Sequence, residues 1–181
     1  MRNDHDWPLP LYSAAQVREL DARLIAAGTP GFELMQRAAH AAWRALRQRW
    51  PQAGAVTVLA GAGNNAGDGY VVAALAQEAG LGVELLQLGD PAQLAGDAAL
   101  ARDQALAAGV VATTTWPSAP AGDVVVDALL GTGLRGTLAA PFAAAVRWIN
   151  AAGRPVLALD LPTGVDADTG AATAPAVRAD V

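Results

Sequence analysis

Two side-chain amides and a carboxylate stand within a run of glycines, a combination that favours a ligand site over a simple turn. The run covers residues 61–69 (GAGNNAGDG) and directly follows an apolar segment, residues 55–60. Its four glycines would let the backbone turn sharply, and the helical spacing that follows would place the positive end of a helix dipole there. Asn64, Asn65 and Asp68 add oxygens that can bind a cation, or hydrogen bond an amide or a sugar. A tight turn without a ligand stays the alternative, because glycine spacing alone is a weak signal.

Two further carboxylates stand at the ends of apolar segments. Asp127 follows residues 124–126 and Asp160 follows residues 155–159, with Thr163 shortly after it. Capping of the next turn would explain one such aspartate, but less easily two at matching positions. Asn65, Asp127 and Thr163 together offer amide, carboxylate and hydroxyl oxygens, which suit a hard cation without choosing among potassium, sodium, calcium and magnesium.

The elements that must position these residues alternate along the chain. Apolar segments predict strands at residues 55–60, 83–88, 110–115, 124–130 and 155–161. Helical spacing and capping residues predict helices over residues 13–28, 30–49, 70–79, 91–108 and 141–152. This alternation predicts an α/β fold, a Rossmann-like doubly wound, mainly parallel sheet in a three-layer α/β/α sandwich. The two leading helices are expected outside that core, and residues 1–181 are expected to form a single domain.

Ligands of such sheets bind at the carboxyl ends of the strands, where the strand order reverses. If the order is 3-2-1-4-5, the ends of the first, fourth and fifth strands are neighbours, and the three polar segments line one cleft. Arg135, in the glycine-rich segment 131–137, could clamp a phosphate there or stand as a solvated surface residue. His5 and His40 lie outside these segments, which argues against a Ser-His-Asp triad.

Composition narrows the class of protein. The 181 residues are 53% hydrophobic with little aromatic content, which suits one domain with a core of small residues. A net charge of -5 without a basic stripe argues against nucleic-acid binding. No apolar run reaches membrane-spanning length, and the start of the chain lacks the features of a signal peptide. The absence of cysteine excludes disulfides and thiolate catalysis and is compatible with the cytoplasm, so we expect a cytoplasmic protein that acts on a small molecule.

Three long motifs in the same order resemble the signatures of the NAD(P)H-hydrate epimerase family, also called the YjeF N-terminal domain. They are residues 61–69 (GAGNNAGDG), 126–136 (VDALLGTGLRG) and 160–166 (DLPTGVD). Residues 12–21 (YSAAQVRELD) are similar to the first helix of that family, so the resemblance covers nearly the whole chain.

The resemblance implies an isomerase of cofactor repair, which interconverts the R and S epimers of NADHX and NADPHX so that a partner dehydratase can restore the usable S form. The chain could also be the N-terminal part of a bifunctional protein in which that dehydratase follows. The resemblance implies that potassium is held by Asn65, Asp127 and Thr163, and that Asp160 is the acid/base residue. It also implies that the hydrated dinucleotide is bound by Asp160 and by two segments: Asn64, Asn65, Ala66, Gly67 and Asp68, then Gly131, Thr132, Gly133, Leu134, Arg135, Gly136 and Thr137. A homodimer is the oligomeric state that the family implies.

The chain departs from the family pattern in three places. Ala66 stands where the family has glycine and Thr163 where it has serine; the second change keeps the hydroxyl. Residues 178–181 read as the beginning of a further strand that the family continues, so we expect the domain to lack its C-terminal strand or strands. Two other functions stay open, an NAD-dependent dehydrogenase and a non-catalytic nucleotide- or protein-binding module. Against the dehydrogenase, Glu84 is the one acidic residue near the expected ribose-binding distance, and it lies inside the second predicted strand.

Overall fold

The computed structural model describes residues 12–134, 136–172 and 175–181, and it confirms the predicted α/β fold. Its five strands form one sheet in the order β3-β2-β1-β4-β5, and all four neighbouring pairs run parallel. The strands are β1 (Ala55–Ala60), β2 (Gly82–Gln87), β3 (Ala112–Thr113), β4 (Val124–Ala128) and β5 (Val156–Ala158). The strand order therefore reverses between β1 and β4, as expected, which places the ends of β1, β4 and β5 side by side.

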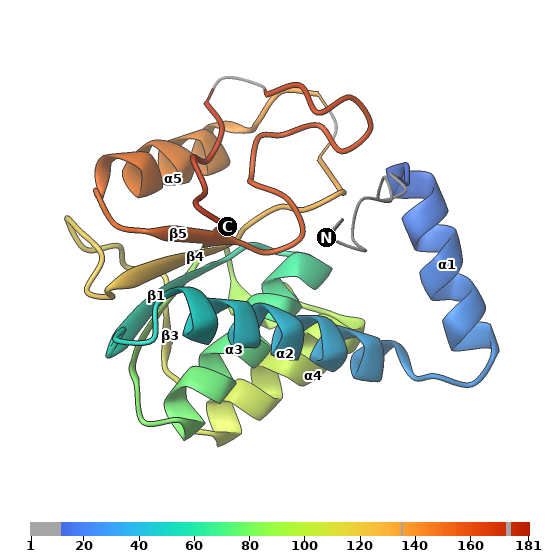
Figure 1. The fold of residues 1–181 in the computed structure, drawn as a ribbon, viewed down its shortest axis with the longest axis horizontal. Coiled ribbons are helices and arrows are strands. Elements are labelled where there is room, and N and C mark those ends of the chain that lie inside the picture. The colour runs from blue at the N-terminus through green and yellow to red at the C-terminus, as the bar shows by residue number, and fades with distance from the viewer. Residues whose placement is uncertain (1–11, 135, 173–174) are drawn as a thin grey trace, which may run out of the picture.

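Helices cover both faces of the sheet and make it a three-layer sandwich (Figure 1). The helices are α1 (Ala14–Ala26), α2 (Gly31–Arg49), α3 (Asn64–Glu78), α4 (Gly96–Ala107) and α5 (Ala140–Ala151), with a short 3-10 helix, η1 (Pro91–Gln93). Strand residues alternate between the two layers: Val124 and Val126 pack in the cluster of α2, α3 and α4, whereas Val125 packs in that of α5. This alternation follows from the two-residue period of a strand. Both faces of the sheet are thus buried, as a parallel sheet requires.

The two leading helices differ in how they pack. The expectation that both lie outside the core is wrong for α2. Met35, Ala39 and Leu46 of α2 are buried in the same cluster as α3 and α4. Helix α1 begins with a capping box at Ser13, and the N–H of Ala14 donates to Oδ1 of Asp168 at 2.8 Å. Beyond this first turn the helix stands apart from the sheet and its covering helices (Figure 1). Its apolar residues are largely exposed: Val17, Leu20, Leu24 and Ile25.

Several predicted boundaries are also wrong. The segment 91–108 does not form one helix, because Leu94 and Ala95 are extended and Gly96 has a positive φ of 56°, so that η1 and α4 are separate. The third strand has only two paired residues instead of the predicted segment 110–115. The fifth strand ends at Ala158, because Asp160 adopts a left-handed conformation that no strand continues.

The last residues of the chain lie along the outer edge of β5. The backbone N–H of Asp180 donates to the carbonyl of Val156 at 2.8 Å, and the N–H of Ala158 donates to the carbonyl of Val181 at 2.9 Å. These bonds extend the pairing of the sheet beyond β5. In the part of the chain that the structure describes, no helix combines the length and the apolar character needed to cross a membrane.

Candidate functional site

The segment predicted as a glycine loop is mostly helix. Only residues 61–63 connect β1 to α3, and α3 already begins at Asn64. Gly67 and Gly69 therefore do not serve a turn, as the sequence suggested, but permit close packing. A Cβ at Gly67 would collide with the side chain of Met35, and one at Gly69 would collide with Ala128. Ala66 and Gly67 are buried in this packing, and their N–H groups bond to the carbonyl of Gly63.

The beginning of α3 has the properties of an anion site. Gly63 is the N-cap residue, and no side chain caps the helix, so the first N–H groups of α3 lack a partner within it. The loop before them approaches β4 so closely that a Cβ at Gly61 would collide with the carbonyl oxygen of Leu129. Asn64 is exposed at this end. The N–H groups and the helix dipole together favour a negatively charged group such as a phosphate.

Asp127 and Thr163 are brought together below the ends of β4 and β5. The Thr163 hydroxyl lies 2.8 Å from Oδ1 of Asp127, and the Thr163 N–H donates to Oδ2 at 2.8 Å. The N–H of Leu129 also donates to Oδ1, so the Asp127 side chain closes a local turn at the end of the strand. Both residues are buried, and burial raises the pKa of Asp127 to about 6, against the opposing effect of the hydrogen bonds from Thr163 and Leu129.

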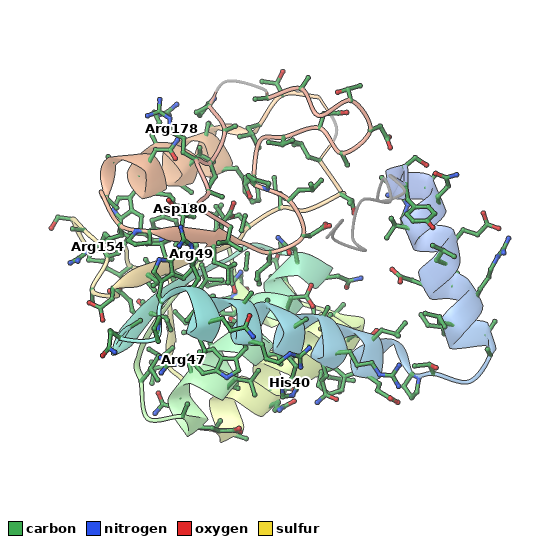
Figure 2. All side chains as sticks on the ribbon, in the orientation of Figure 1. His40, Arg47, Arg49, Arg154, Arg178 and Asp180 are labelled. Carbon is green, nitrogen blue, oxygen red and sulfur yellow. The ribbon has the colours of Figure 1, made fainter. Side chains whose placement is uncertain are left out.

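Asn65 fits the predicted cation site in its chemistry. Its Oδ1 and Nδ2 atoms are both buried, and neither has a hydrogen-bond partner among the described residues. A buried amide without a partner is costly, so a ligand for it is expected. Within the same described part of the chain, no three His, Cys, Asp or Glu side chains cluster as metal ligands, and His40 lies exposed on α2 (Figure 2). The neutral and singly charged oxygens of Asn65, Asp127 and Thr163 suit a weakly charged hard cation better than zinc.

Asp160 is held in an unusual conformation. Among the described residues it is the non-glycine residue with a positive φ, of 64°. Its Oδ2 accepts a hydrogen bond from the N–H of Thr132 at 2.7 Å, and a Cβ at Gly131 would collide with this oxygen. Asp160 itself is exposed. Backbone strain of this kind is characteristic of functional sites, where the surrounding structure holds the residue in place.

Asp68 shares the electrostatic environment of Asp160. It lies half-buried near the beginning of α3, and burial, followed by the negative charge of Asp160, raises the pKa of Asp68 to about 7. A carboxyl group whose pKa is raised in this way can hold a proton at neutral pH. Pairs of interacting carboxyl groups are a common acid/base arrangement.

The second glycine-rich segment is only partly at the surface. Gly133, Gly136 and Thr137 are exposed and Thr132 is half-buried, but Leu134 packs in the core with α5. Arg135 lies outside the described residues, so its predicted role as a phosphate clamp stays a prediction.

Sequence reasoning missed Gln87 and Tyr70, which lie directly beneath the glycine loop. The Tyr70 hydroxyl donates to Oε1 of Gln87 at 2.8 Å, and Nε2 of Gln87 donates to the carbonyl of Gly61. Gln87 is the last residue of β2, and a polar residue at the end of an apolar strand was the signal available in the sequence.

The site is formed at the strand ends, and a separate hollow of the described structure lies elsewhere. That hollow, of about 420 Å3, is lined by Arg49, Trp50 and Asp123 among others, and contains none of the predicted site residues. Asp123 uses its carboxylate to accept hydrogen bonds from the N–H groups of Gly54 and Ala55. It therefore has a structural role where β1 and β4 begin, at the end of these strands opposite the site.

The fold and the strand-end site define a Rossmann-like α/β protein with an anion-binding helix end, a buried aspartate–threonine pair and a strained aspartate. A family model described as YjeF-related protein N-terminus matches residues 31–181, and the chain belongs to this family. This finding confirms the resemblance that the three sequence motifs indicated.

Curated relatives divide into long and short proteins. The chain is 44% identical over 172 residues to the bifunctional NAD(P)H-hydrate repair enzyme Nnr of Coxiella burnetii, covering 94% of this chain and 35% of that protein. It is 36% identical over 178 residues to the NAD(P)H-hydrate epimerase of Rhodopirellula baltica, covering 95% of this chain and 72% of that protein. The chain thus spans about a third of the length of the bifunctional relative. The crystal structure of the yeast protein ynu0 has the same fold, with a TM-score of 0.82 at 22% identity, over 94% of this chain and 78% of the yeast chain.

Proposed function

We propose that this chain is an NAD(P)H-hydrate epimerase, which interconverts the R and S epimers of NADHX and NADPHX in nicotinamide cofactor repair. The observation that carries the proposal is the position of Asp160, whose carboxylate is held exposed by the N–H of Thr132 at the ends of the parallel strands. Relatives that align with nearly the whole chain are named NAD(P)H-hydrate epimerase.

The chemistry of the reaction suits these residues. Inverting an oxygen-bearing carbon beside a ring nitrogen needs reversible bond breaking and a proton shuttle, and no external hydride acceptor. Asp160 can move that proton. Asp68 lies within the electrostatic influence of Asp160 and holds a proton near neutral pH, so it can supply or receive the proton in the return step. The dinucleotide phosphates would bind at the uncapped beginning of α3, with Asn64 and the exposed residues of 131–137 around the rest of the substrate.

We further propose that Asn65, Asp127 and Thr163 hold a potassium ion. The unpartnered buried amide of Asn65 and the carboxylate of Asp127 would contribute oxygens, and Thr163 a hydroxyl. The ion would supply a fixed positive charge near the substrate phosphates. Asp127 already accepts three hydrogen bonds from the protein, so its orientation is set without the ion.

Neither alternative function gains support from the site. A classical dehydrogenase would place an acidic side chain on the cofactor ribose, but Glu84 accepts hydrogen bonds from the Thr57 hydroxyl at 2.7 Å and the Ala121 N–H at 3.0 Å. The last residue of β2, where such a carboxylate belongs, is the fully engaged Gln87. A purely non-catalytic module would have no need of a strained aspartate at the strand ends.

The partners that we propose follow from this activity. An NAD(P)H-hydrate dehydratase would consume the S epimer, either as a separate protein or as part of the same polypeptide, and both would act in the cytoplasm, where the cofactor pool is used. We also propose a homodimer, because α1 exposes Val17, Leu20, Leu24 and Ile25. Exposed apolar residues on one helix are a common dimer contact.

A coupled assay tests the proposal. NADHX enriched in the R epimer is incubated with a dehydratase specific for the S epimer, with and without the purified chain, and NADH formation is followed at its absorbance maximum. Without the chain, the slow phase of NADH formation is limited by spontaneous epimerisation of the R epimer. The proposal predicts that adding the chain removes this slow phase. An unchanged slow phase at high chain concentration would contradict it.

A further inference from the structure

We infer that Gln87 and Tyr70 are positioning residues that fix the direction of the glycine loop, and through it the affinity for the dinucleotide. This inference rests on the proposed function and deepens it. Neither residue is among those proposed above to transfer the proton, bind the dinucleotide or hold the cation. Both are buried, with exposed fractions of 1% for Gln87 and 0% for Tyr70, and each of their polar side-chain atoms takes part in a hydrogen bond.

The hydrogen bonds leave the Gln87 amide one orientation. Nε2 donates to the carbonyls of Gly61 and Leu88, which can only accept, and Oε1 accepts from the Tyr70 hydroxyl. A flipped amide would place its oxygen against two carbonyl oxygens. Burial raises the pKa of Tyr70 to about 12, so the hydroxyl keeps its proton and stays a donor throughout the neutral range.

The Tyr70–Gln87 pair, called the clamp below, acts on the first peptide of the glycine loop. The N–H of Gly61 donates to the carbonyl of Ala128 on β4 at 3.0 Å, while its carbonyl accepts from Gln87 on β2. Gly61 is therefore bonded to the strands on both sides of β1. In a planar trans peptide the carbonyl and the following N–H point in opposite directions, so the bond to Gln87 also directs the N–H of Ala62. Ala62, Gly63 and Asn64 lead from this peptide into the uncapped beginning of α3.

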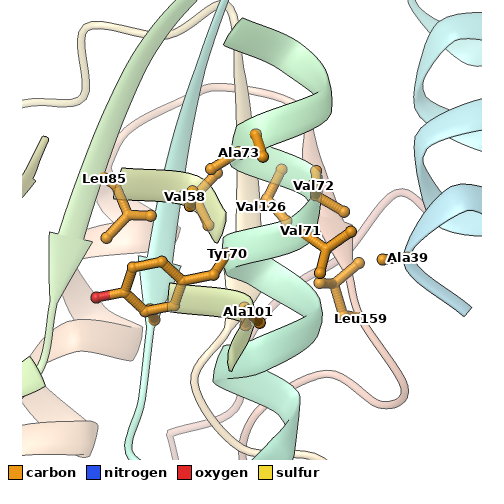
Figure 3. Packing of buried hydrophobic residues seen from close by; sticks show 14 of the residues in the cluster. Ala39, Val58, Tyr70, Val71, Val72, Ala73, Leu85, Ala101, Val126 and Leu159 are labelled. Atoms are coloured by element: carbon orange, nitrogen blue, oxygen red, sulfur yellow. The ribbon is translucent and has the colours of Figure 1, made fainter. Parts of the chain in front are cut away.

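A purely structural role would not need polar groups here. The Tyr70 ring extends from α3 toward the sheet beside Val58 and Leu85 (Figure 3). A phenylalanine would fill the same apolar space without the cost of burying a hydroxyl. What the tyrosine adds is the orientation of Gln87, and what Gln87 adds is a donor for the loop carbonyl.

Loop orientation affects the bound substrate and the transition state alike, so its loss raises KM and leaves kcat nearly unchanged. The test compares Tyr70→Phe, Gln87→Met and the double variant with Thr57→Val. Thr57 is a matched control, because it is equally buried in β1 and its hydroxyl also makes two hydrogen bonds, to Glu84 at 2.7 Å and from the N–H of Gly122 at 2.9 Å, far from the loop.

We expect Tyr70→Phe and Gln87→Met to raise the KM for NADHX about 5- to 10-fold with kcat within about twofold, and Thr57→Val to leave KM unchanged. The double variant should resemble Gln87→Met, because the two residues act as one unit. An equal rise of KM in Thr57→Val, or no rise in the other variants, would overturn the inference.

A second measurement needs no substrate and separates this inference from the proposed activity. Hydrogen exchange of the Gly61 amide should be faster in Tyr70→Phe and Gln87→Met than in Thr57→Val at equal global stability. If the wild-type chain does not epimerise NADHX, the proposed function fails, whereas selective exchange at Gly61 would still support the clamp. Equal exchange in all the variants would overturn the clamp even where epimerisation is observed.

Discussion

The backbone N–H of Thr132 donates to Oδ2 of Asp160 at 2.7 Å, so one hydrogen bond joins the segment after β4 to the turn after β5. Glycine at position 131 makes this approach possible, because a side chain there would collide with the carboxylate. The proposed acid/base residue is thus oriented by a main-chain donor. This donor keeps its proton at every pH, so it is available to the Asp160 carboxylate whenever that carboxylate is ionised.

Replacing Asp160 with asparagine should remove activity and preserve the fold. Asparagine tolerates the left-handed conformation that Asp160 adopts, but its amide cannot shuttle a proton. We expect kcat to fall about 10²- to 10⁴-fold, the usual contribution of a positioned acid/base group. Asp90→Asn is the control, since Asp90 only caps η1 through a hydrogen bond from the N–H of Ala92. An Asp160→Asn variant with wild-type kcat would remove Asp160 from the mechanism.

The carboxyl group of Asp68 should make the free energy of unfolding depend on pH. Its pKa is raised from 3.8 to about 7 in the folded chain, so between these values the folded state binds a proton that the unfolded state has lost. The protonated carboxyl group of Asp68 therefore favours the folded state. Its contribution to the free energy of unfolding is fully present below pH 4 and is lost as the pH rises through 7. Asp68→Asn should therefore gain stability relative to the wild type between pH 5 and 8. Urea midpoints measured across this range would refute the prediction if the two curves ran parallel.

Thr163 offers a test of the buried pair through two substitutions of different chemistry. Thr163→Val would leave Oδ1 of Asp127 without its hydroxyl donor and the N–H of Leu130 without its acceptor. Unpaired buried groups of this kind cost about 1–3 kcal/mol in the free energy of unfolding. Thr163→Ser keeps the hydroxyl and should cost no more than about 1 kcal/mol, the value of one buried methyl group. If the hydroxyl had no such role, chemical denaturation would show equal losses of unfolding free energy in Thr163→Val and Thr163→Ser.

Asn65 should reveal the cation without an activity assay. Leucine is similar in size and has no polar atoms, so Asn65→Leu should be more stable than the wild type in buffers that contain only large organic cations, by about 1 kcal/mol. Potassium should raise the Tm of the wild type and leave that of Asn65→Leu unchanged, because only a folded site binds the ion. Asn64→Leu is the matched control, since Asn64 is exposed next to it. Equal potassium effects on all three proteins would argue against this site.

The sequence predicted the sheet and its polar strand ends because both depend on local patterns. Apolar segments defined the five strands, and the expected order 3-2-1-4-5 placed Asp127 and Thr163 near each other, as the structure confirms. The pattern did not separate the glycines of the loop from those of α3. Gly67 and Gly69 are needed for their contacts with Met35 and Ala128, which come from distant parts of the chain.

Other features depend on three-dimensional neighbours that no spacing shows. The left-handed turn at Asp160 is held by Thr132, and the orientation of Gln87 depends on Tyr70, two pairs that are distant in sequence. Helix α1 has a clear amphipathic pattern, yet its apolar face is exposed in the single chain. The periodicity predicted the helix but could not predict which surface covers it.

Direct chromatography of the two epimers tests the central claim. Purified R-NADHX is incubated with this chain in potassium buffer, and in a buffer with only organic cations, and the appearance of the S epimer is compared with its spontaneous rate. We predict conversion well above the spontaneous rate, with the faster conversion in potassium. Conversion at the spontaneous rate in both buffers, with a chain that is demonstrably folded, would contradict the assignment of an epimerase site at the strand ends.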